Sequence, residues 1–104
     1  MKRTKWMLAA MPLLAAGPLW AQAQDALYLR SMAATCANCH GTDGKSLEGA
    51  SVVGLAGLDR NHIVAQMRAF KAGTRQATVM HQLAKGYSDA QIEQLAAYFA
   101  AQKK

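Results

Sequence analysis

The stretch that decides the fold of this chain is Cys36-Ala37-Asn38-Cys39-His40. The two cysteines are three positions apart, and a histidine follows the second one directly. In an α-helix, positions i, i+3 and i+4 lie on one face, so a single helical turn presents both thiols and the imidazole to the same side. The sequence therefore predicts a site at which two sulfurs and one ring nitrogen act on the same bound group.

This C-x-x-C-H spacing is the sequence of covalent haem attachment. Two thiols so placed can reach the two vinyl groups along one side of a porphyrin, and the imidazole of His40 can reach the iron. We therefore predict one covalent haem c, attached through Cys36 and Cys39, with His40 as an axial ligand of the iron.

The two cysteines have three other possible interpretations. A dithiol redox enzyme places C-x-x-C after a strand, whereas the residues before Cys36 have a helical pattern. A zinc site needs a second Cys/His pair with ligand spacing, and the sequence has none. A chance match is the third, but the chain length, the helical context and an export signal all agree with haem attachment.

The export signal lies at the start of the chain. Three basic residues fall within the first five positions, an apolar stretch covers residues 6–20, and Ala21-Gln22-Ala23 has small residues where a signal peptidase cleaves. The apolar stretch contains two prolines and is too short to span a bilayer comfortably; an uncleaved anchor is the alternative. We expect residues 1–23 to be a cleaved secretory signal peptide and residues 24–104 to be a periplasmic domain with no membrane span.

Removal of the signal changes both the charge and the size. The whole chain carries 12 Lys and Arg against 6 Asp and Glu, a formal charge of +6, and residues 24–104 retain only +3. So mild an excess is not typical of a nucleic-acid-binding protein, and we expect no nucleic acid partner. The remaining 81 residues are few, so their hydrophobic core is marginal. A bound haem would enlarge this core. A disulfide between Cys36 and Cys39 would close too small a loop to stabilise the fold much.

The rest of the chain has a helical pattern without convincing strand alternation. One helix is predicted to begin at Asp25 as N-cap, a second to end at Gly73, and a third to begin with a capping box of Ser88 and Gln91. Their apolar stripes are Leu29, Met32, Ala33 and Cys36; Ile63, Val64, Met67 and Phe70; and Ile92, Leu95, Ala96 and Phe99.

Two long irregular segments, residues 41–57 and 74–87, separate these helices; the second has room for a short helical turn. Segments of this length are unusual in a small domain unless they serve a function, such as wrapping around a large cofactor. We predict an all-α fold with three main helices and long loops wrapped around one covalently attached haem.

With these features the chain resembles the class I cytochromes c over essentially all of residues 24–104. Leu95 and Tyr98 match the paired apolar and aromatic positions of the family's C-terminal helix, and Leu55-Ala56-Gly57-Leu58 matches its loop on the histidine side. The resemblance implies one monohaem domain, in which the C-terminal helix crosses the N-terminal one and a loop methionine is the second iron ligand.

The resemblance places that second ligand at Met80, which lies 40 residues after His40. Met32 and Met67 belong to helical stripes, where methionine is more often a core residue. His81 is the rival of Met80 but is expected to be a solvated side chain.

We also predict the surroundings of two further residues, His62 and Val53. His62 is expected on the surface. Val53 stands where many relatives have a proline whose carbonyl accepts a hydrogen bond from the axial histidine, and the Val53 carbonyl can accept the same bond.

Histidine and methionine together leave no open iron position, which favours one-electron transfer over substrate turnover. We expect no catalysis from this chain alone. A narrower resemblance, in FKAGTR (70–75), ATVMH (77–81) and AKGYSD (84–89), is to the cytochrome subunit of flavocytochrome c sulfide dehydrogenases and, less closely, to the cytochromes c4. It implies a sulfide-oxidising flavoprotein subunit as electron donor and other redox proteins as acceptors.

Other functions use the same residues. One is a free, diffusible monohaem cytochrome, similar to cytochromes c4 or c5, that carries electrons between respiratory complexes. Another is a haem sensor with a labile Met80. The last is a thiol oxidoreductase, which haem attachment through both sulfurs would exclude.

Overall fold

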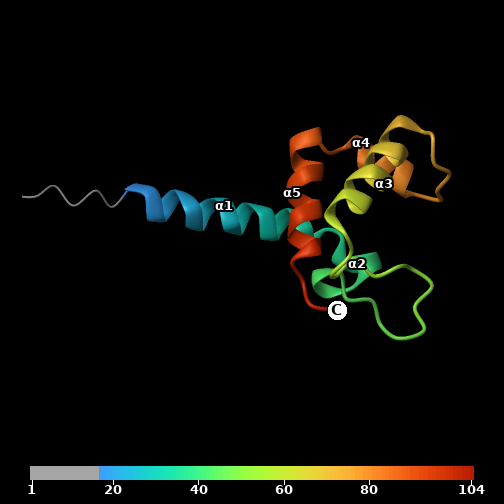
Figure 1. Cartoon of the computed structure of the whole chain (residues 1–104), viewed down its shortest axis with the longest axis horizontal. Coiled ribbons are helices and arrows are strands. Elements are labelled where there is room, and N and C mark those ends of the chain that lie inside the picture. The colour runs from blue at the N-terminus through green and yellow to red at the C-terminus, as the bar shows by residue number, and fades with distance from the viewer. Residues whose placement is uncertain (1–16) are drawn as a thin grey trace, which may run out of the picture.

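The computed structural model describes residues 17–104, and it confirms the all-α prediction. No strand occurs in that part of the chain, and three long helices are joined by shorter ones and loops (Figure 1). The helices are α1 (Gly17–Ala34), α2 (Ala37–His40), the 3₁₀ turn η1 (Thr42–Gly44), α3 (Arg60–Ala72), α4 (Met80–Lys85) and α5 (Asp89–Ala100). Most of the predicted signal peptide, residues 1–16, lies outside the described residues.

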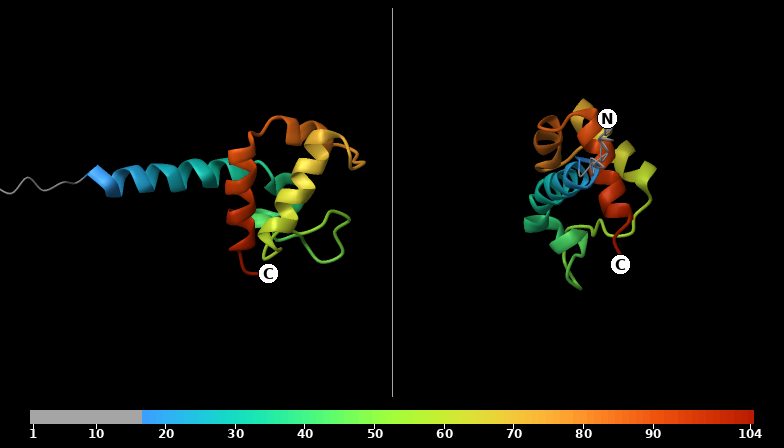
Figure 2. Two further views of the ribbon diagram at one scale, coloured as in Figure 1. Left: turned by 45° about the horizontal axis from the view of Figure 1, so that its top comes forward. Right: turned by 90° about the vertical axis from the view of Figure 1, so that its left-hand side faces the viewer.

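The helices pack into a globule from which the first half of α1 projects (Figures 1 and 2). α5 packs against the end of α1 and along α3, while α4 packs on α3. This is the crossing of N-terminal and C-terminal helices that the family resemblance implied. The core lies where these helices meet, and its buried residues are Ala33, Ile63, Val64, Ile92, Leu95, Ala96 and Phe99.

The ends of α3 and α5 follow local sequence signals. The Asp59 carboxylate accepts the backbone N–H of His62 at 2.9 Å, and α3 ends at Gly73 with a φ of 77°, the left-handed conformation predicted there. At α5, Ser88 Oγ accepts the N–H of Gln91 at 3.1 Å, and the Gln91 side chain accepts the N–H of Ser88 at 2.9 Å. The predicted capping box is therefore confirmed.

The predicted start of the first helix is wrong. Asp25 lies inside α1, which is already helical at Gly17. The reason is local, because residues 19–24 include no proline, glycine or β-branched residue and so continue the helix. The predicted cleavage point after Ala23 therefore falls within α1.

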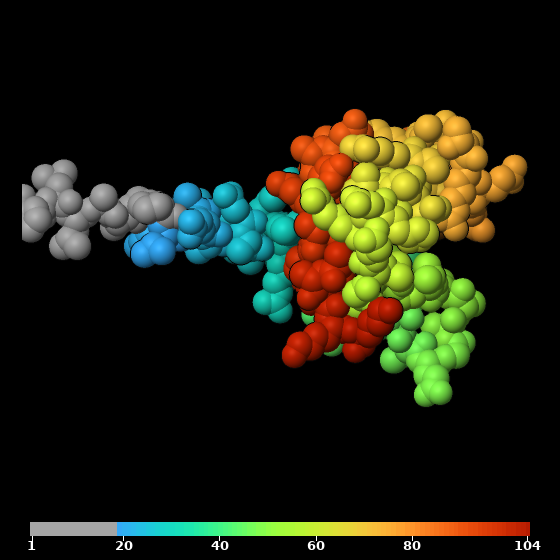
Figure 3. Space-filling model, in the orientation of Figure 1, coloured from blue at the N-terminus to red at the C-terminus, as the bar shows by residue number. Residues whose placement is uncertain are grey.

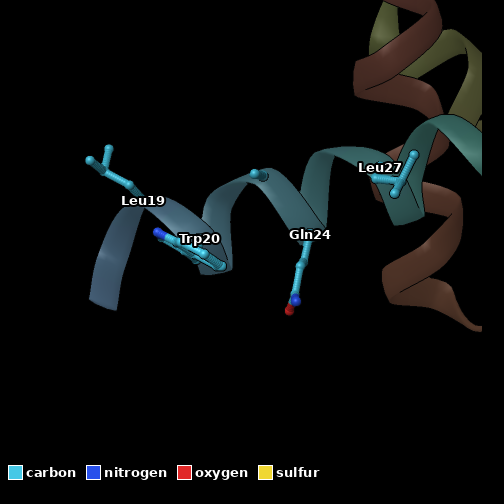
Figure 4. A pocket seen from close by; sticks show the side chains of 5 residues that line it. Leu19, Trp20, Gln24 and Leu27 are labelled. Carbon is cyan, nitrogen blue, oxygen red and sulfur yellow. The ribbon is translucent and has the colours of Figure 1, made fainter. Parts of the chain in front are cut away.

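The projecting part of α1 has no packing partner in the globule. Leu19 and Trp20 are 72% and 74% exposed. A shallow hollow is lined by residues on both sides of the predicted cleavage point (Figure 4), namely Leu19, Trp20, Ala23, Gln24 and Leu27. Cleavage after Ala23 would remove three of these five residues, so we do not consider the hollow a candidate functional site. Within residues 17–104, no helix is long and apolar enough to cross a membrane.

The two long connections differ in structure. The first contains η1 and then an exposed irregular loop at residues 45–53, which forms a green lobe in Figure 3. The second contains α4, so the short helical turn allowed for there is present, and Met80 is the first residue of that helix.

Candidate haem-binding site

The C-x-x-C-H motif forms the predicted helical turn. The carbonyl of Cys36 accepts the backbone N–H of Cys39 at 3.3 Å and of His40 at 3.0 Å. Both cysteines are free thiols; Cys36 is half-buried and Cys39 is exposed. The short helix α2 and the residue before it thus hold two thiols and an imidazole on one helical turn.

One ring nitrogen of His40 forms a hydrogen bond. Its Nδ1 lies 2.6 Å from the carbonyl oxygen of Val53. A carbonyl can only accept, so Nδ1 carries the proton and the lone pair lies on Nε2. This confirms that the Val53 carbonyl can take the place of the proline carbonyl, and it leaves His40 in the form in which a histidine binds a metal.

The loop that supplies the Val53 carbonyl is held by η1. The carbonyl of Gly44 accepts the N–H of Leu55 at 2.8 Å and of Ala56 at 3.1 Å. Gly44 is buried with a φ of 77°, and a Cβ there would lie 2.8 Å from Phe99 Cδ1. Only glycine fits so close to α5 in this conformation.

The same turn is bonded to α5 by a side chain. The hydroxyl of Tyr98 donates to Asp43 Oδ1 at 2.5 Å, and the Tyr98 ring meets Phe99 edge to face, with centroids 5.3 Å apart. Donation to Asp43, followed by burial, raises the pKa of Tyr98 above its ordinary value. Sequence reasoning identified Tyr98 only as a packing residue and missed Asp43. The signal lay in Asp43-Gly44 directly after the motif, since aspartate and glycine tolerate left-handed conformations.

Met80 comes from another part of the globule. It is half-buried at the start of α4, which packs on α3 and buries Ala84 completely. In contrast, α2 packs on η1 and on the end of α1. In Figure 1, α4 lies near the top of the globule and α2 lies in its lower half. To ligate one iron together, His40 and Met80 would have to face each other with the iron between them.

The other predicted residues can also be placed. Met32 and Met67 pack against the core, as their helical stripes predicted, and His62 is exposed, as expected. The expectation that His81 is solvated is wrong: the side chain is half-buried, and its Nδ1 is buried without a hydrogen-bond partner. The reason is that residue 81 belongs to α4, which is packed on α3, rather than to an open loop.

Exposed apolar side chains accompany these candidate ligands. Val79 and Leu83, on either side of Met80, are 47% and 49% exposed, and Val53, beside His40, is 63% exposed. Apolar surface gains free energy when it is removed from water. A haem would cover such surface, and the donor set of two thiols, an imidazole with a free Nε2 and a thioether fits its attachment and ligation.

The Cys36 thiol does not have the lowered pKa that is typical of the nucleophile of a dithiol enzyme. Burial raises the pKa of the Cys36 thiol, and the neighbouring Thr35 hydroxyl only partly opposes this effect. Reactive thiols in such enzymes have a lowered pKa, because the thiolate is the nucleophile. The raised pKa of Cys36 therefore does not support a role in thiol–disulfide exchange.

The chain is similar to several c-type cytochromes. It is 33% identical over 84 residues to cytochrome c-554(548) of Halomonas halodenitrificans, a match that covers 78% of this chain and all of that protein. It is 42% identical over 66 residues to the cytochrome subunit of sulfide dehydrogenase of Chlorobaculum tepidum, covering 62% of this chain and 57% of that subunit. It is 38% identical over 81 residues to cytochrome c4 of Pseudomonas aeruginosa, covering 78% and 40% respectively. No protein-family model matches.

The helical fold and these similarities define an electron carrier of the c-type cytochrome class. More narrowly, the chain belongs to the class I cytochromes c, a family whose members bind haem c. It spans little more than half the length of the sulfide dehydrogenase subunit and less than half the length of that cytochrome c4.

Proposed function

We propose that this cytochrome carries single electrons through one haem c, which is attached by Cys36 and Cys39 and ligated by His40 and Met80. The observation that carries the proposal is the bond from His40 Nδ1 to the Val53 carbonyl. It leaves Nε2 available to iron on the same helical turn as both thiols.

The residues have separate tasks. Cys36 and Cys39 would hold the haem, each by addition of its S–H across one vinyl group, which would need no oxidant. His40 donates its Nδ1 proton to Val53, which makes Nε2 a stronger base. The Met80 thioether would be the other protein ligand of the iron and would favour the ferrous state. When bound, the haem iron supplies reversible one-electron chemistry.

The experiment that tests this proposal combines mass and spectra. The purified protein should carry the mass of one haem after denaturation, and the Cys36→Ser, Cys39→Ser double variant should carry none. Met80→Ala should open the iron and lower the reduction potential, while His81→Ala, the matched control beside it, should leave both unchanged. A Met80→Ala spectrum that stays six-coordinate and unshifted would remove Met80 from the ligand set.

We propose a sulfide-oxidising flavoprotein as the electron donor. The 42% identity to a cytochrome subunit of sulfide dehydrogenase supports this partner. In the native preparation at low salt, a larger flavin-containing chain should then co-elute, and added sulfide should reduce the haem. The alternative is a free carrier between respiratory complexes, which the full-length match to cytochrome c-554(548) supports. A haem spectrum with no flavin and no response to sulfide would favour this alternative.

The periplasm is the proposed location, after cleavage behind Ala23. The basic start, the apolar stretch and Ala21-Gln22-Ala23 support cleavage at this point. The mass of the protein from the periplasmic fraction should correspond to a chain that begins at Gln24. A full-length chain in the membrane fraction would instead indicate an uncleaved anchor.

A further inference from the structure

Two neighbouring aromatic residues near the end of α5 hold the segments that follow the C-x-x-C-H motif. The Tyr98 hydroxyl donates to Asp43 Oδ1 at 2.5 Å. The carbonyl of Phe99 accepts the N–H of Gly57 at 2.9 Å, and the Phe99 ring lies against Gly44. The turn η1 and the loop after it are therefore both fastened to the same short piece of α5.

These contacts connect in series to the imidazole of His40. The Gly44 carbonyl, one residue after Asp43, accepts the amides of Leu55 and Ala56. Val53 precedes Leu55 by two residues in the same loop. Its carbonyl accepts a hydrogen bond from His40 Nδ1. Residues 45–53 are almost all exposed, so the position of this carbonyl depends on where the loop is anchored.

The backbone of Asp43 has an unfavourable conformation. Its φ is 53°, and it is the only residue other than glycine with a positive φ among residues 17–104. Strained backbone persists where surrounding contacts hold it, and it is concentrated at functional sites. The contact that holds the Asp43 side chain is the one with Tyr98.

α5 does not depend on this hydrogen bond. The helix has its own capping box, and it buries Ile92, Leu95 and Ala96 in the core. The Tyr98 hydroxyl therefore stabilises η1 more than it stabilises α5.

We propose that Asp43 and Tyr98 are a positioning pair: their hydrogen bond fixes η1 and, through the Gly44 carbonyl, keeps the Val53 carbonyl on His40 Nδ1. The pair thereby sets the basicity of the histidine. The proposal rests on the proposed function in one respect, the role of His40 as an axial ligand.

The first variant is Tyr98→Phe in the haem-loaded protein, because it removes the hydroxyl and keeps the ring against Phe99. Hydrogen exchange of the Leu55 and Ala56 amides should become about tenfold faster or more, since a hydrogen bond to a charged group is lost. Exchange of the α3 amides should not change. The reduction potential should rise, because a weaker bond to Val53 makes His40 less basic and stabilises ferric iron less.

Tyr87→Phe is the matched control. It removes a hydroxyl that lies 3.0 Å from Thr35 Oγ1, next to Cys36 but outside the path from Asp43 to His40. It should leave the Leu55 and Ala56 amides and the potential near their wild-type values. If both tyrosine variants shift exchange and potential alike, the effect is general loosening and the positioning role of Tyr98 is refuted.

Two substitutions of Asp43 test the other partner. Asp43→Asn keeps an acceptor and tolerates the left-handed conformation, so it should retain slow exchange at Leu55 and Ala56. Asp43→Gly relieves the backbone but removes the acceptor, so it should match Tyr98→Phe. If Asp43→Gly exchanges as slowly as the wild type, the proposal is wrong. The exchange readout follows the polypeptide alone, so it is separate from failure of haem attachment, which the denatured mass detects.

Discussion

At the scale of single residues, main-chain groups set the environment of His40. Val53 takes part through its carbonyl, so a residue without the rigidity of proline still serves as the partner of His40. Gly44 takes part through its carbonyl and through its lack of a side chain. The side chains of Asp43 and Tyr98 lie one step further from His40, because they contact η1 rather than the loop that contains Val53.

Gly44→Ala should destabilise the protein strongly. A Cβ would lie 2.8 Å from Phe99 Cδ1 and 2.9 Å from the Ala56 nitrogen, and the φ of 77° disfavours alanine. We expect a loss of about 2–4 kcal/mol in the free energy of unfolding, from overpacking and backbone strain together. Gly49→Ala is the control, because Gly49 has a φ of 78° with nothing within 4 Å. It should lose only about 1 kcal/mol. Equal losses in urea unfolding would show that the contact with Phe99 does not matter.

Stability should depend on the Tyr98 hydroxyl at alkaline pH. The hydrogen bond to Asp43, then burial and the Asp43 charge, raise the pKa of Tyr98 above its ordinary 10.0, against a smaller opposite effect of Arg30. Because the folded-state pKa is the higher one, this stabilisation is complete below pH 10 and is lost as the pH rises through the folded-state pKa. The free energy of unfolding should therefore fall more steeply above pH 10 in the wild type than in Tyr98→Phe. Parallel curves for the two proteins would contradict the raised pKa.

At the scale of elements, the capping box of α5 offers a clean test. Ser88→Ala removes the acceptor of the Gln91 N–H and should cost about 1 kcal/mol. Ser31→Ala is the matched control, since the Ser31 hydroxyl only donates to the carbonyl of Leu27 within α1. It should change stability by less than about 0.5 kcal/mol. Thermal unfolding of the two variants beside the wild type gives the comparison, and an unaffected Ser88→Ala would mean that the cap contributes nothing.

The features of the helices that could be predicted from the sequence depend mainly on contacts between residues close together in the chain. Gly73 and the Ser88–Gln91 pair mark helix ends through contacts a few residues apart, and both predictions hold. The start of α1 was missed because the predicted signal residues continue the helix beyond Asp25. The bond between Asp43 and Tyr98 joins residues 55 positions apart, and no local pattern encodes such a pair.

At the scale of the whole molecule, the described core is small, and among its larger side chains only Ile92 is completely buried. A covalent haem would add a large apolar body to it, as expected for a domain of this size. The Cys36→Ser, Cys39→Ser double variant should therefore lose about 20 °C or more in its thermal midpoint, as several kcal/mol of stabilisation are removed. Circular dichroism during heating measures this loss. A midpoint equal to that of the haem-loaded protein would show that the polypeptide folds on its own contacts.

The attachment of η1 and its loop to α5 has a consequence for the order of synthesis. The ribosome makes Cys36, Cys39 and His40 early, and it makes Tyr98 and Phe99 among the last residues of this sequence. Attachment of a haem would need only residues 36–40, whereas a fixed position of the His40 ring would also need α5 to be packed against η1. The two requirements therefore lie in parts of the sequence that are made at different times.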